Sequence, residues 1–183
     1  MKKEIEVKIE LTPEEFNNLI ESSDNFHLER TFGYFKKDFS NIKDGIFPRI
    51  KYVEDGEKKE IFLTVKRKVK ENVQFFEREE MEVKAGEGEN TENLREILKS
   101  LGFSKEIIFE KKRKNVFKND ITISFDELPF GFFVEFEGEP EAIDRYLGEY
   151  NLSGRPRITR AYLGLWEDYR KVHDIVEENC VFK

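Results

Sequence analysis

The stretch Glu4-Ile5-Glu6-Val7-Lys8-Ile9-Glu10-Leu11 alternates charged and apolar residues without a break. Successive side chains of a β-strand point to opposite faces, so this pattern predicts a strand with one charged face and one apolar face. Thr12-Pro13-Glu14-Glu15 follows directly and has the residues of a helix capping box, with proline at the first helical position. We therefore expect the chain to begin with a strand and a short helix.

The same reasoning places the other elements. Strands are expected at about 26–39, 46–53, 58–69, 73–83, 106–117, 121–127 and 131–137. Helices are expected at about 91–101, 141–149 and 159–178. Runs of strands separated by few helices predict an α+β fold with an antiparallel sheet. We expect a single domain over residues 1–183, with a core of about 1–170 and a C-terminal helix to about 178.

Composition narrows the class of protein. The 183 residues include 39 Asp and Glu against 32 Lys and Arg, a net charge of −7, yet 14% are aromatic, which argues against disorder. One cysteine and two histidines argue against a disulfide, a thiolate cluster and a histidine-rich metal site. No apolar run approaches the roughly 20 residues of a membrane span. We expect a cytoplasmic protein with neither a membrane nor a nucleic acid as partner.

The charged residues of the predicted strands fall at alternating positions, on one face of each strand. The predicted face carries the bases Lys8, Arg49, Lys51, Lys66, Lys68, Arg78, Lys111 and Arg113. It carries the acids Glu4, Glu6, Glu80, Glu82, Asp126, Glu135 and Glu137. In the strand at 106–117 the phase is open, and Lys112 and Lys114 could replace Lys111 and Arg113.

Two arrangements of this charged face are possible. It could lie in water, with helices covering the apolar face, or it could point inward if the sheet closes into a barrel. Ionised groups inside a barrel must be paired, hydrated or neutralised by a ligand. A nearly balanced mixture of both signs suits a polyanion held by Lys and Arg together with a divalent metal held by carboxylates. Ligation by oxygen alone favours Mg²⁺ or Mn²⁺ over zinc.

Ordered motifs on these strands carry a family resemblance. Glu4-Ile-Glu6-Val-Lys8 matches an ExExK signature, and Pro-Arg49-Ile-Lys51, Leu-Thr-Val-Lys66, Arg78-Glu-Glu80-Met-Glu82-Val, Lys111-Lys-Arg113, Asp126 and Gly-Phe-Phe-Val-Glu135-Phe-Glu137 follow in order. With these motifs the chain resembles CYTH domains, the triphosphate tunnel metalloenzymes, which include class IV adenylyl cyclases and thiamine triphosphatase-like proteins. The resemblance implies a closed or nearly closed barrel of eight antiparallel strands, the triphosphate tunnel, with helices packed outside.

The resemblance also implies roles for the charged residues. Metal, as Mg²⁺ or Mn²⁺, would be held by Glu4, Glu6, Glu135, Glu137, Asp126 and Glu80. Phosphate oxygens would be held by Lys8, Arg49, Lys51, Lys66, Arg78, Lys111 and Arg113. Lys8, Lys66 and Arg113 would be the catalytic cations among them.

The implied partner is a small triphosphate-bearing molecule such as ATP or tripolyphosphate, bound by a monomer or homodimer. The first candidate activity is that of a class IV adenylyl cyclase, from ATP to cAMP and pyrophosphate. The alternative is a triphosphatase acting on tripolyphosphate, a nucleoside triphosphate or thiamine triphosphate. A third hypothesis is a noncatalytic module that binds polyphosphate or nucleotide.

Some residues depart from the family pattern or carry weaker signals. The second strand in the family has an Asp-x-Tyr-Phe-Asp type of run, which Phe35-Lys-Lys-Asp38-Phe39 only approximates. His27 and His173 are interpreted as surface or packing residues, and Cys180 as incidental near an exposed C-terminus. Gly86-Glu-Gly88 is interpreted as an ordinary loop. Arg155, Arg157 and Arg160 are interpreted as a solvated helix start rather than a substrate clamp.

Overall fold

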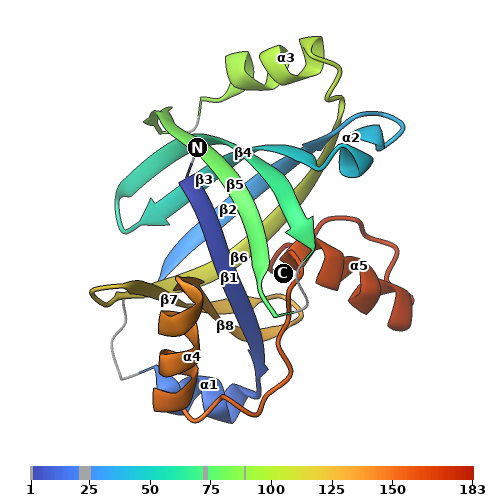
Figure 1. Ribbon diagram of the computed structural model, residues 1–183. Coiled ribbons are helices and arrows are strands. Elements are labelled where there is room, and N and C mark those ends of the chain that lie inside the picture. Colours follow the sequence, from blue (N-terminus) through green and yellow to red (C-terminus); the bar gives the residue numbers. More distant parts are fainter. Residues whose placement is uncertain (1, 21–25, 72–73, 89) are drawn as a thin grey trace.

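The protein is described by a computed structural model that covers residues 2–20, 26–71, 74–88 and 90–183, with the side chains of these residues except 2 and 68–71. The described chain forms one closed antiparallel barrel with helices around it (Figure 1). Its strands are β1 (Lys2–Leu11), β2 (His27–Phe35), β3 (Ile46–Asp55), β4 (Lys58–Glu71), β5 (Phe76–Glu87), β6 (Lys105–Phe117), β7 (Ile121–Leu128) and β8 (Gly131–Gly138). Its helices are α1 (Pro13–Leu19), α2 (Ser40–Lys43), α3 (Glu92–Ser100), α4 (Pro140–Glu149) and α5 (Tyr162–Val172).

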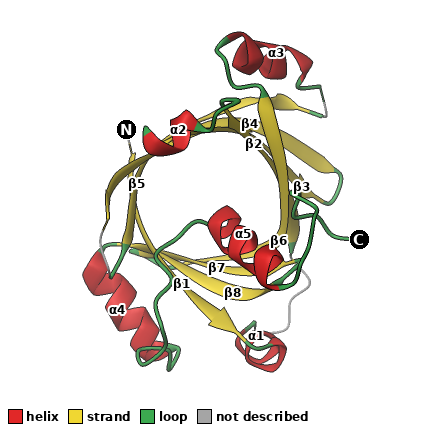
Figure 2. Cartoon of the chain, turned by 90° about the vertical axis from the view of Figure 1, so that its right-hand side faces the viewer, coloured by secondary structure: helices red, strands yellow, loops and turns green. Residues whose placement is uncertain are grey.

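Around the barrel the strands follow the order β1-β5-β4-β3-β2-β6-β7-β8, and β8 pairs with β1 to close it. Figure 2 looks along the barrel, with the strands as a ring and α5 in front of part of the opening. The fold class predicted from the sequence is confirmed. Because the sheet is closed, one face of every strand points into the barrel and the other points outward. The positions of the hydrophobic cores show which of the two faces is the inner one.

The main hydrophobic core lies outside the barrel wall, between the strands and two helices. Ile5, Val7 and Ile9 of β1 pack in one cluster with Phe16 of α1 and Ile143 of α4. The predicted capping box of α1 is present, since Thr12 and Glu15 each bond the other's backbone N–H. Burial of the apolar face of β1 under these helices turns its charged face to the interior of the barrel.

A second core cluster lies under α3. Ile50 and Tyr52 of β3 and Phe32 of β2 are buried there with Leu98 of α3. The Tyr52 hydroxyl lies 2.6 Å from the Thr91 hydroxyl at the start of that helix. Arg49 and Lys51, which alternate with Ile50 and Tyr52 along β3, therefore face the other way.

Three predicted boundaries were wrong. β2 ends at Phe35 rather than near residue 39, because Phe39 has a left-handed backbone (φ 56°) that starts the short helix α2. β5 extends past residue 83 to Glu87 and includes Gly86, which was expected in a loop; the chain turns at Gly88, which has φ 85°. The last helix covers only Tyr162–Val172, because Asp174 adopts φ 54° and ends it.

The segments on either side of α5 tie this helix to the barrel. Ile158 exchanges two backbone hydrogen bonds with Lys8, at 2.9 and 3.1 Å, on the edge of β1 that β5 no longer covers. Beyond the helix, Cys180 makes a parallel bridge with Phe109 of β6. Cys180 is fully buried, so its expected position near an exposed terminus was wrong. None of the helices in the described part of the chain has the length and apolar character needed to cross a membrane.

Candidate functional site: a charged tunnel

Strand register brings the predicted charged residues together on the inner face of the barrel. Residues that pair directly across two strands share a face, and the register pairs Glu4 with Arg78, Lys66 with Glu80, and Lys8 with Glu135. The described inner face holds Glu4, Glu6, Lys8, Arg49, Lys51, Lys66, Arg78, Glu80, Glu82, Lys111, Arg113, Asp126, Glu135 and Glu137. In β6 the inward pair is Lys111 and Arg113, while Lys112 pairs outside with Glu127. Lys68 has the same phase, but its side chain lies outside the described residues.

One group of ion pairs joins β1, β4 and β5. The Lys66 ammonium lies 2.7 Å from Glu4 Oε2 and 2.6 Å from Glu80 Oε2. The Arg78 guanidinium lies 2.7 Å from Glu6 Oε2 and 3.5 Å from Glu4 Oε2. All of these side chains are at most 13% exposed, so their mutual attraction is only weakly screened by solvent.

A second group joins β1, β6, β7 and β8. Lys8 bonds Glu6 and lies 3.1 Å from Glu135, and Arg113 lies 3.0 Å from that same Glu135. Arg113 also makes a bidentate pair with Asp126, at 2.6 and 2.5 Å. Burial by itself would raise the pKa of Glu135, but Arg113, Lys8 and Lys111 outweigh it and hold the pKa well below the usual range. This carboxylate is therefore charged at neutral pH.

Arg49 differs from the other cations of the lining. It makes no ion pair with any side chain that the structure describes, whereas Lys66 and Arg78 on the next two strands do. Burial, and then the charge of Arg78, lower the pKa of Arg49. The pKa of Lys66 is lowered by burial and by the charges of Arg78 and Arg49. Neighbouring cations thus lower the pKa of Arg49 and of Lys66, whereas carboxylates raise the pKa of Arg78, and an anion beside Arg49 and Lys66 would favour their charged forms.

Arg78 also has a hydrogen-bond donor that is left unsatisfied among the described residues. Its Nε is buried and has no hydrogen-bond partner among the described residues. A buried donor left unpaired costs free energy, and an anionic oxygen in the tunnel would accept this bond. The Nε of Arg78 and the guanidinium of Arg49 are therefore donors on the inner face without a partner among the described residues.

Carboxylates suited to a hard divalent cation also line the tunnel, on the wall formed by β8 and β1. Glu6 and Glu137 pair directly across these two strands, with Glu4 next on β1 and Glu135 next on β8. Oxygen ligands of this kind fit Mg²⁺ or Mn²⁺ in chemistry. Among the described residues, however, no three such groups converge on one point, because Lys or Arg holds Glu4, Glu6 and Glu135. A cation would enter only when these ion pairs are exchanged.

Sequence reasoning missed two groups of the site. Glu29 of β2 is buried, and its Oε2 lies 3.1 Å from the Lys111 ammonium. His27, interpreted as a surface or packing residue, lies beside it, with Nε2 3.1 Å from Glu29 Oε1. The alternation of His27, Glu29 and Thr31 was the available signal, but the expected strand was taken too long for its phase to stand out.

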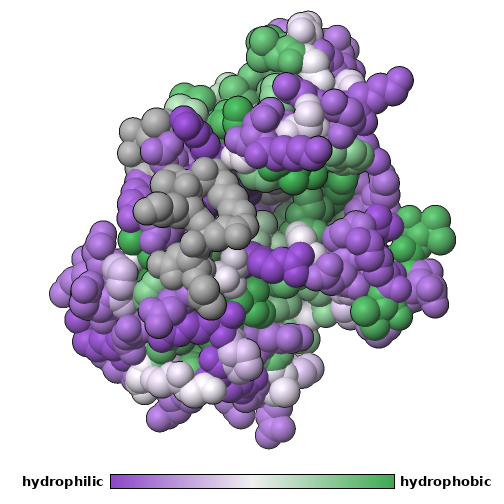
Figure 3. All heavy atoms as spheres, turned by 45° about the vertical axis from the view of Figure 1, so that its right-hand side comes forward, coloured by the Kyte–Doolittle hydropathy of each residue, from purple (hydrophilic) through white to green (hydrophobic). Residues whose placement is uncertain are grey.

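Tyr162 was the second omission. It comes from α5, outside the barrel, yet its hydroxyl donates to Asp126 Oδ2 at 2.8 Å. Its ring lies over the ammonium of Lys8, 5.1 Å from the ring centre, and stacks against Phe109. Tyr162 thus covers the inner residues at this end of the barrel, where Figure 3 shows a hollow with hydrophobic side chains inside and hydrophilic ones around its edge.

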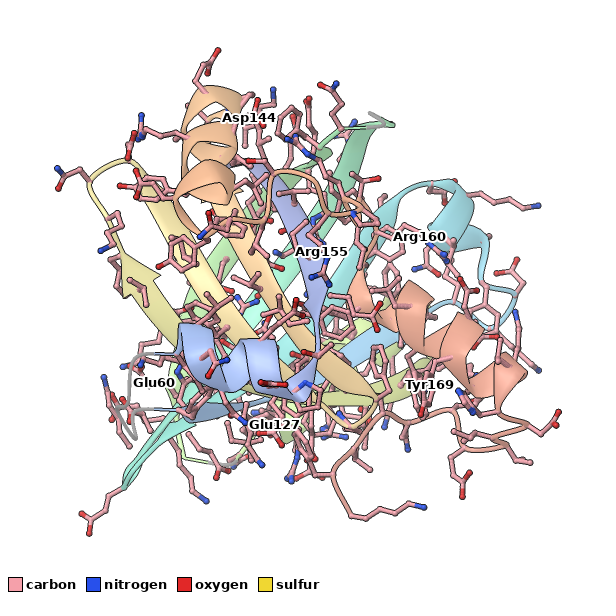
Figure 4. All side chains as sticks on the ribbon, turned by 90° about the horizontal axis from the view of Figure 1, so that it is seen from below. Glu60, Glu127, Asp144, Arg155, Arg160 and Tyr169 are labelled. Atoms are coloured by element: carbon pink, nitrogen blue, oxygen red, sulfur yellow. The ribbon has the colours of Figure 1, made fainter. Side chains whose placement is uncertain are left out.

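Other candidates lie outside the lining. Asp38 is exposed and accepts a hydrogen bond from the Ser40 backbone, so the Phe35–Phe39 run begins α2 rather than extending the site. Arg155, Arg157 and Arg160 pair with Glu15, Asp144 and Asp168, at 2.6, 2.6 and 2.5 Å. Through these pairs the three arginines fasten the segment before α5, and Figure 4 shows Asp144 on α4 and Arg160 close to α5.

Comparison with solved structures shows which proteins share this architecture. The PH1819 protein of Pyrococcus horikoshii OT3 superposes with a TM-score of 0.68 at 25% identity, covering 91% of this chain and 99% of that one. A candidate adenylate cyclase from Vibrio parahaemolyticus gives 0.67 at 18% identity, covering 91% and 98%. A candidate adenylyl cyclase from Hippeastrum with a dominant triphosphatase activity gives 0.61 at 16% identity, covering 92% and 96%. Neither a family model nor a curated protein matches the sequence.

The fold and the inner face define the protein as an eight-stranded barrel with an ionised tunnel. The fold implied by the resemblance to CYTH domains is confirmed, since it is that of the candidate adenylate cyclases.

Proposed function

We propose that the tunnel holds the triphosphate group of its substrate together with Mg²⁺ or Mn²⁺, and that the protein is an enzyme of triphosphate chemistry. The observation that carries the proposal is the trio of Arg49, Lys66 and Arg78 on adjacent strands of the inner face, with Arg78 buried, Arg49 and Lys66 half-buried, and Arg49 lacking a carboxylate partner among the described residues. Cations fixed in a desolvated tunnel are the groups that stabilise charge on a transferring phosphoryl group.

Binding would proceed by exchange of ion pairs. The lining is nearly balanced in charge, so a polyanion entering alone would leave the tunnel strongly negative. When phosphate oxygens take over Lys66 and Arg78, the carboxylates of Glu4 and Glu6 lose their partners. These oxygens, with Glu135 and Glu137 opposite, would then hold the metal, and Asp126 and Glu80 would support it. The metal when bound supplies charge neutralisation at the phosphoryl oxygens.

The side chains of the chain itself then position the reacting groups. Lys8 and Arg113 lie beside Glu135 on one wall, and Arg49, Lys66 and Arg78 occupy the other, so a polyphosphate between them would be held from both sides. Lys51 and Lys111 extend these two walls toward the end of the barrel where the β3–β4 hairpin lies. Phosphoryl transfer depends chiefly on such positioning and on charge stabilisation.

The first candidate reaction is that of a class IV adenylyl cyclase, in which the ribose 3′-hydroxyl attacks the α-phosphorus of ATP and pyrophosphate leaves. It is supported by the fold shared with candidate adenylate cyclases from Vibrio parahaemolyticus and Bacillus halodurans. The second candidate is a triphosphatase, in which water attacks the γ-phosphorus. The dominant triphosphatase activity of the Hippeastrum protein supports it.

A product assay tests the proposal. Purified protein is incubated with ATP, and separately with tripolyphosphate, in Mg²⁺ and in Mn²⁺, and cAMP, pyrophosphate and phosphate are measured. Turnover should fall at least about a hundredfold in Glu4→Ala/Glu6→Ala and in Lys66→Ala, the effect of removing a charge-stabilising group. Glu79→Gln is the matched control, because Glu79 lies next to Glu80 on β5 but faces outward, 3.9 Å from Arg67.

The outcomes are distinct. Undiminished turnover in Glu4→Ala/Glu6→Ala with an unchanged circular dichroism spectrum would refute the metal assignment. Tight triphosphate binding without any product in either metal would instead support the noncatalytic module. Formation of cAMP separates the cyclase from the triphosphatase directly.

A further inference from the structure

Tyr162 reaches the inner residues of the barrel from α5, outside the wall of strands. It is the first residue of α5 and lies four residues after Ile158, whose backbone exchanges two hydrogen bonds with Lys8, at 2.9 and 3.1 Å. The ring of Tyr162 lies over the ammonium of that same Lys8, with 5.1 Å between Nζ and the ring centre. The backbone bridge therefore fixes the position of this ring relative to Lys8.

The hydroxyl of Tyr162 is joined to Arg113 through one carboxylate. It donates to Asp126 Oδ2 at 2.8 Å, and Arg113 bonds both oxygens of Asp126, at 2.6 and 2.5 Å. Asp126 is fully buried, so these side chains rather than solvent set the direction of its carboxylate. A bidentate pair in turn fixes the plane of the guanidinium. The orientation of Arg113 in the tunnel thus depends on the Tyr162 hydroxyl by way of Asp126.

The ring of Tyr162 acts on the ammonium groups of the same wall. The Lys8 ammonium lies 5.1 Å from the centre of this ring and 5.6 Å from that of Phe76, both within the range of a cation–π interaction. The Lys111 ammonium lies 5.9 Å from the Tyr162 ring. A ring face occupies space that water would otherwise fill, which reduces the screening of the cation beside it. A cation in such surroundings stabilises charge on a phosphoryl group more strongly.

Tyr162 is itself fixed in place and has no hydrogen left for a ligand. Its ring packs against Phe133 and Phe109, with centres 5.2 and 6.0 Å apart, and the residue is buried. A hydroxyl carries one hydrogen, and here Asp126 accepts it. Tyr162 therefore cannot also donate to a phosphate oxygen, and it can influence a reaction only through the groups that it contacts.

We propose that Tyr162 is a positioning residue for the reaction in the tunnel. Its hydroxyl directs Arg113 through Asp126, and its ring keeps water away from Lys8, so it acts on two of the three cations expected to be catalytic. This assignment rests on the proposed function. It adds that α5 contributes to the rate of the reaction as well as covering one end of the barrel.

The test separates the hydroxyl from the ring, with ATP or tripolyphosphate as substrate, whichever the wild type turns over. Tyr162→Phe keeps the ring, and kcat should fall about tenfold, the effect of a lost hydrogen bond to a charged group. The KM should stay within about twofold, because every cation that holds the phosphates keeps its charge. Tyr162→Leu also removes the ring, and kcat should fall about tenfold further.

A second background shows whether the hydroxyl acts through Arg113. In Arg113→Lys the bidentate pair with Asp126 is already lost, so adding Tyr162→Phe should lower kcat by less than about twofold. Tyr169→Phe is the matched control and should change neither kcat nor KM. Tyr169 lies on the same helix (Figure 4) but packs against Phe130 and Trp166 instead of the charged lining.

Three results would overturn the assignment. An unchanged kcat in Tyr162→Phe, whatever its melting temperature, would leave Tyr162 with a packing role only. A full tenfold loss on adding Tyr162→Phe to Arg113→Lys would show that the hydroxyl does not act through Arg113. An equal loss in Tyr169→Phe would indicate a general effect of altering α5. A wild-type protein that turns over neither substrate would contradict the proposed function itself, and this result is seen before any variant is compared.

Discussion

Arg49 and Lys66 are neighbours on the inner face of adjacent strands, but they contribute differently to the stability of the folded protein. Lys66 joins Glu4 and Glu80, so it holds three strands together. Arg49 has no such carboxylate partner among the described residues, and the more distant charges of Glu80, Glu4 and Glu6 offset its partial burial only in part, since its pKa is lowered. Residues kept for binding and residues kept for folding can therefore be told apart in one site.

This contrast predicts opposite effects on stability. In the ligand-free protein, Arg49→Met should raise the free energy of unfolding by about 1 kcal/mol, because a half-buried cation without a carboxylate partner among the described residues is removed. Lys66→Met should lower it by about 3 kcal/mol, because two buried carboxylates lose their partner. Urea denaturation of the two variants measures both changes, and the melting-temperature increase caused by tripolyphosphate should vanish in each. A loss of stability in Arg49→Met as large as that in Lys66→Met would show that Arg49 has a structural partner.

At the scale of the element, the segments around α5 are the part of the fold that sequence patterns described least well. The alternation of β1 and the capping box of α1 are local signals, and both are confirmed. The bridges of Ile158 to Lys8 and of Cys180 to Phe109 join residues far apart in the chain, and no local pattern announces them. The contact of Tyr162 with Asp126 depends on those bridges, so it could not be predicted from the sequence.

The burial of Cys180 gives a way to follow this C-terminal segment. Burial, and to a lesser extent Glu110, raise the pKa of the Cys180 thiol to about 12, so the reactive thiolate is scarce near neutral pH. A thiol reagent should therefore modify the native protein slowly, and the rate should jump on unfolding in urea. Triphosphate should slow the modification further if binding stabilises the closed barrel. Immediate modification of the native protein would show that the bridge to Phe109 opens readily.

For the whole molecule, period-two patterning predicted which residues share the charged face but left open whether that face points inward. The resemblance to CYTH domains implied the barrel, and a closed sheet converts one face of every strand into an interior. The same patterning did not separate paired from unpaired charges. It could not show that Arg113 bonds both Asp126 and Glu135 while Arg49 is left without a carboxylate among the described residues. Such pairing depends on stagger around the barrel, which a single strand does not encode.

The ion pairs inside the barrel also set the stability of the molecule against acid. Burial favours a raised pKa for Glu29, but Lys111, His27, Arg113 and Lys51 together hold this pKa well below its ordinary value of 4.5. A carboxyl whose pKa is depressed on folding stabilises the protein above its unfolded pKa and loses that contribution as the pH falls through its folded pKa. Wild-type protein should therefore be more stable than Glu29→Gln at pH 7.

The advantage of the wild type should begin to shrink below about pH 4.5 and disappear under stronger acid. Denaturation of both proteins across this range measures the difference at each pH. A constant gap between the two curves would mean that Glu29 contributes by packing or hydrogen bonding rather than by its charge.

The pairing of β1 with β8 has a consequence for how the protein is made. Glu6 meets Glu137 and Leu11 meets Phe132, so the first strand of the barrel to be synthesised must wait for the last strand of the barrel before its second edge is filled. Until then the charged face of β1 is not enclosed by the barrel. Ile158, which pairs with Lys8 on the remaining edge of β1, is synthesised later still. Pairing between two strands this far apart in the sequence forms slowly, and strand edges stay exposed in the meantime. The nascent chain is therefore most exposed to misassembly in the interval between synthesis of β1 and synthesis of β8.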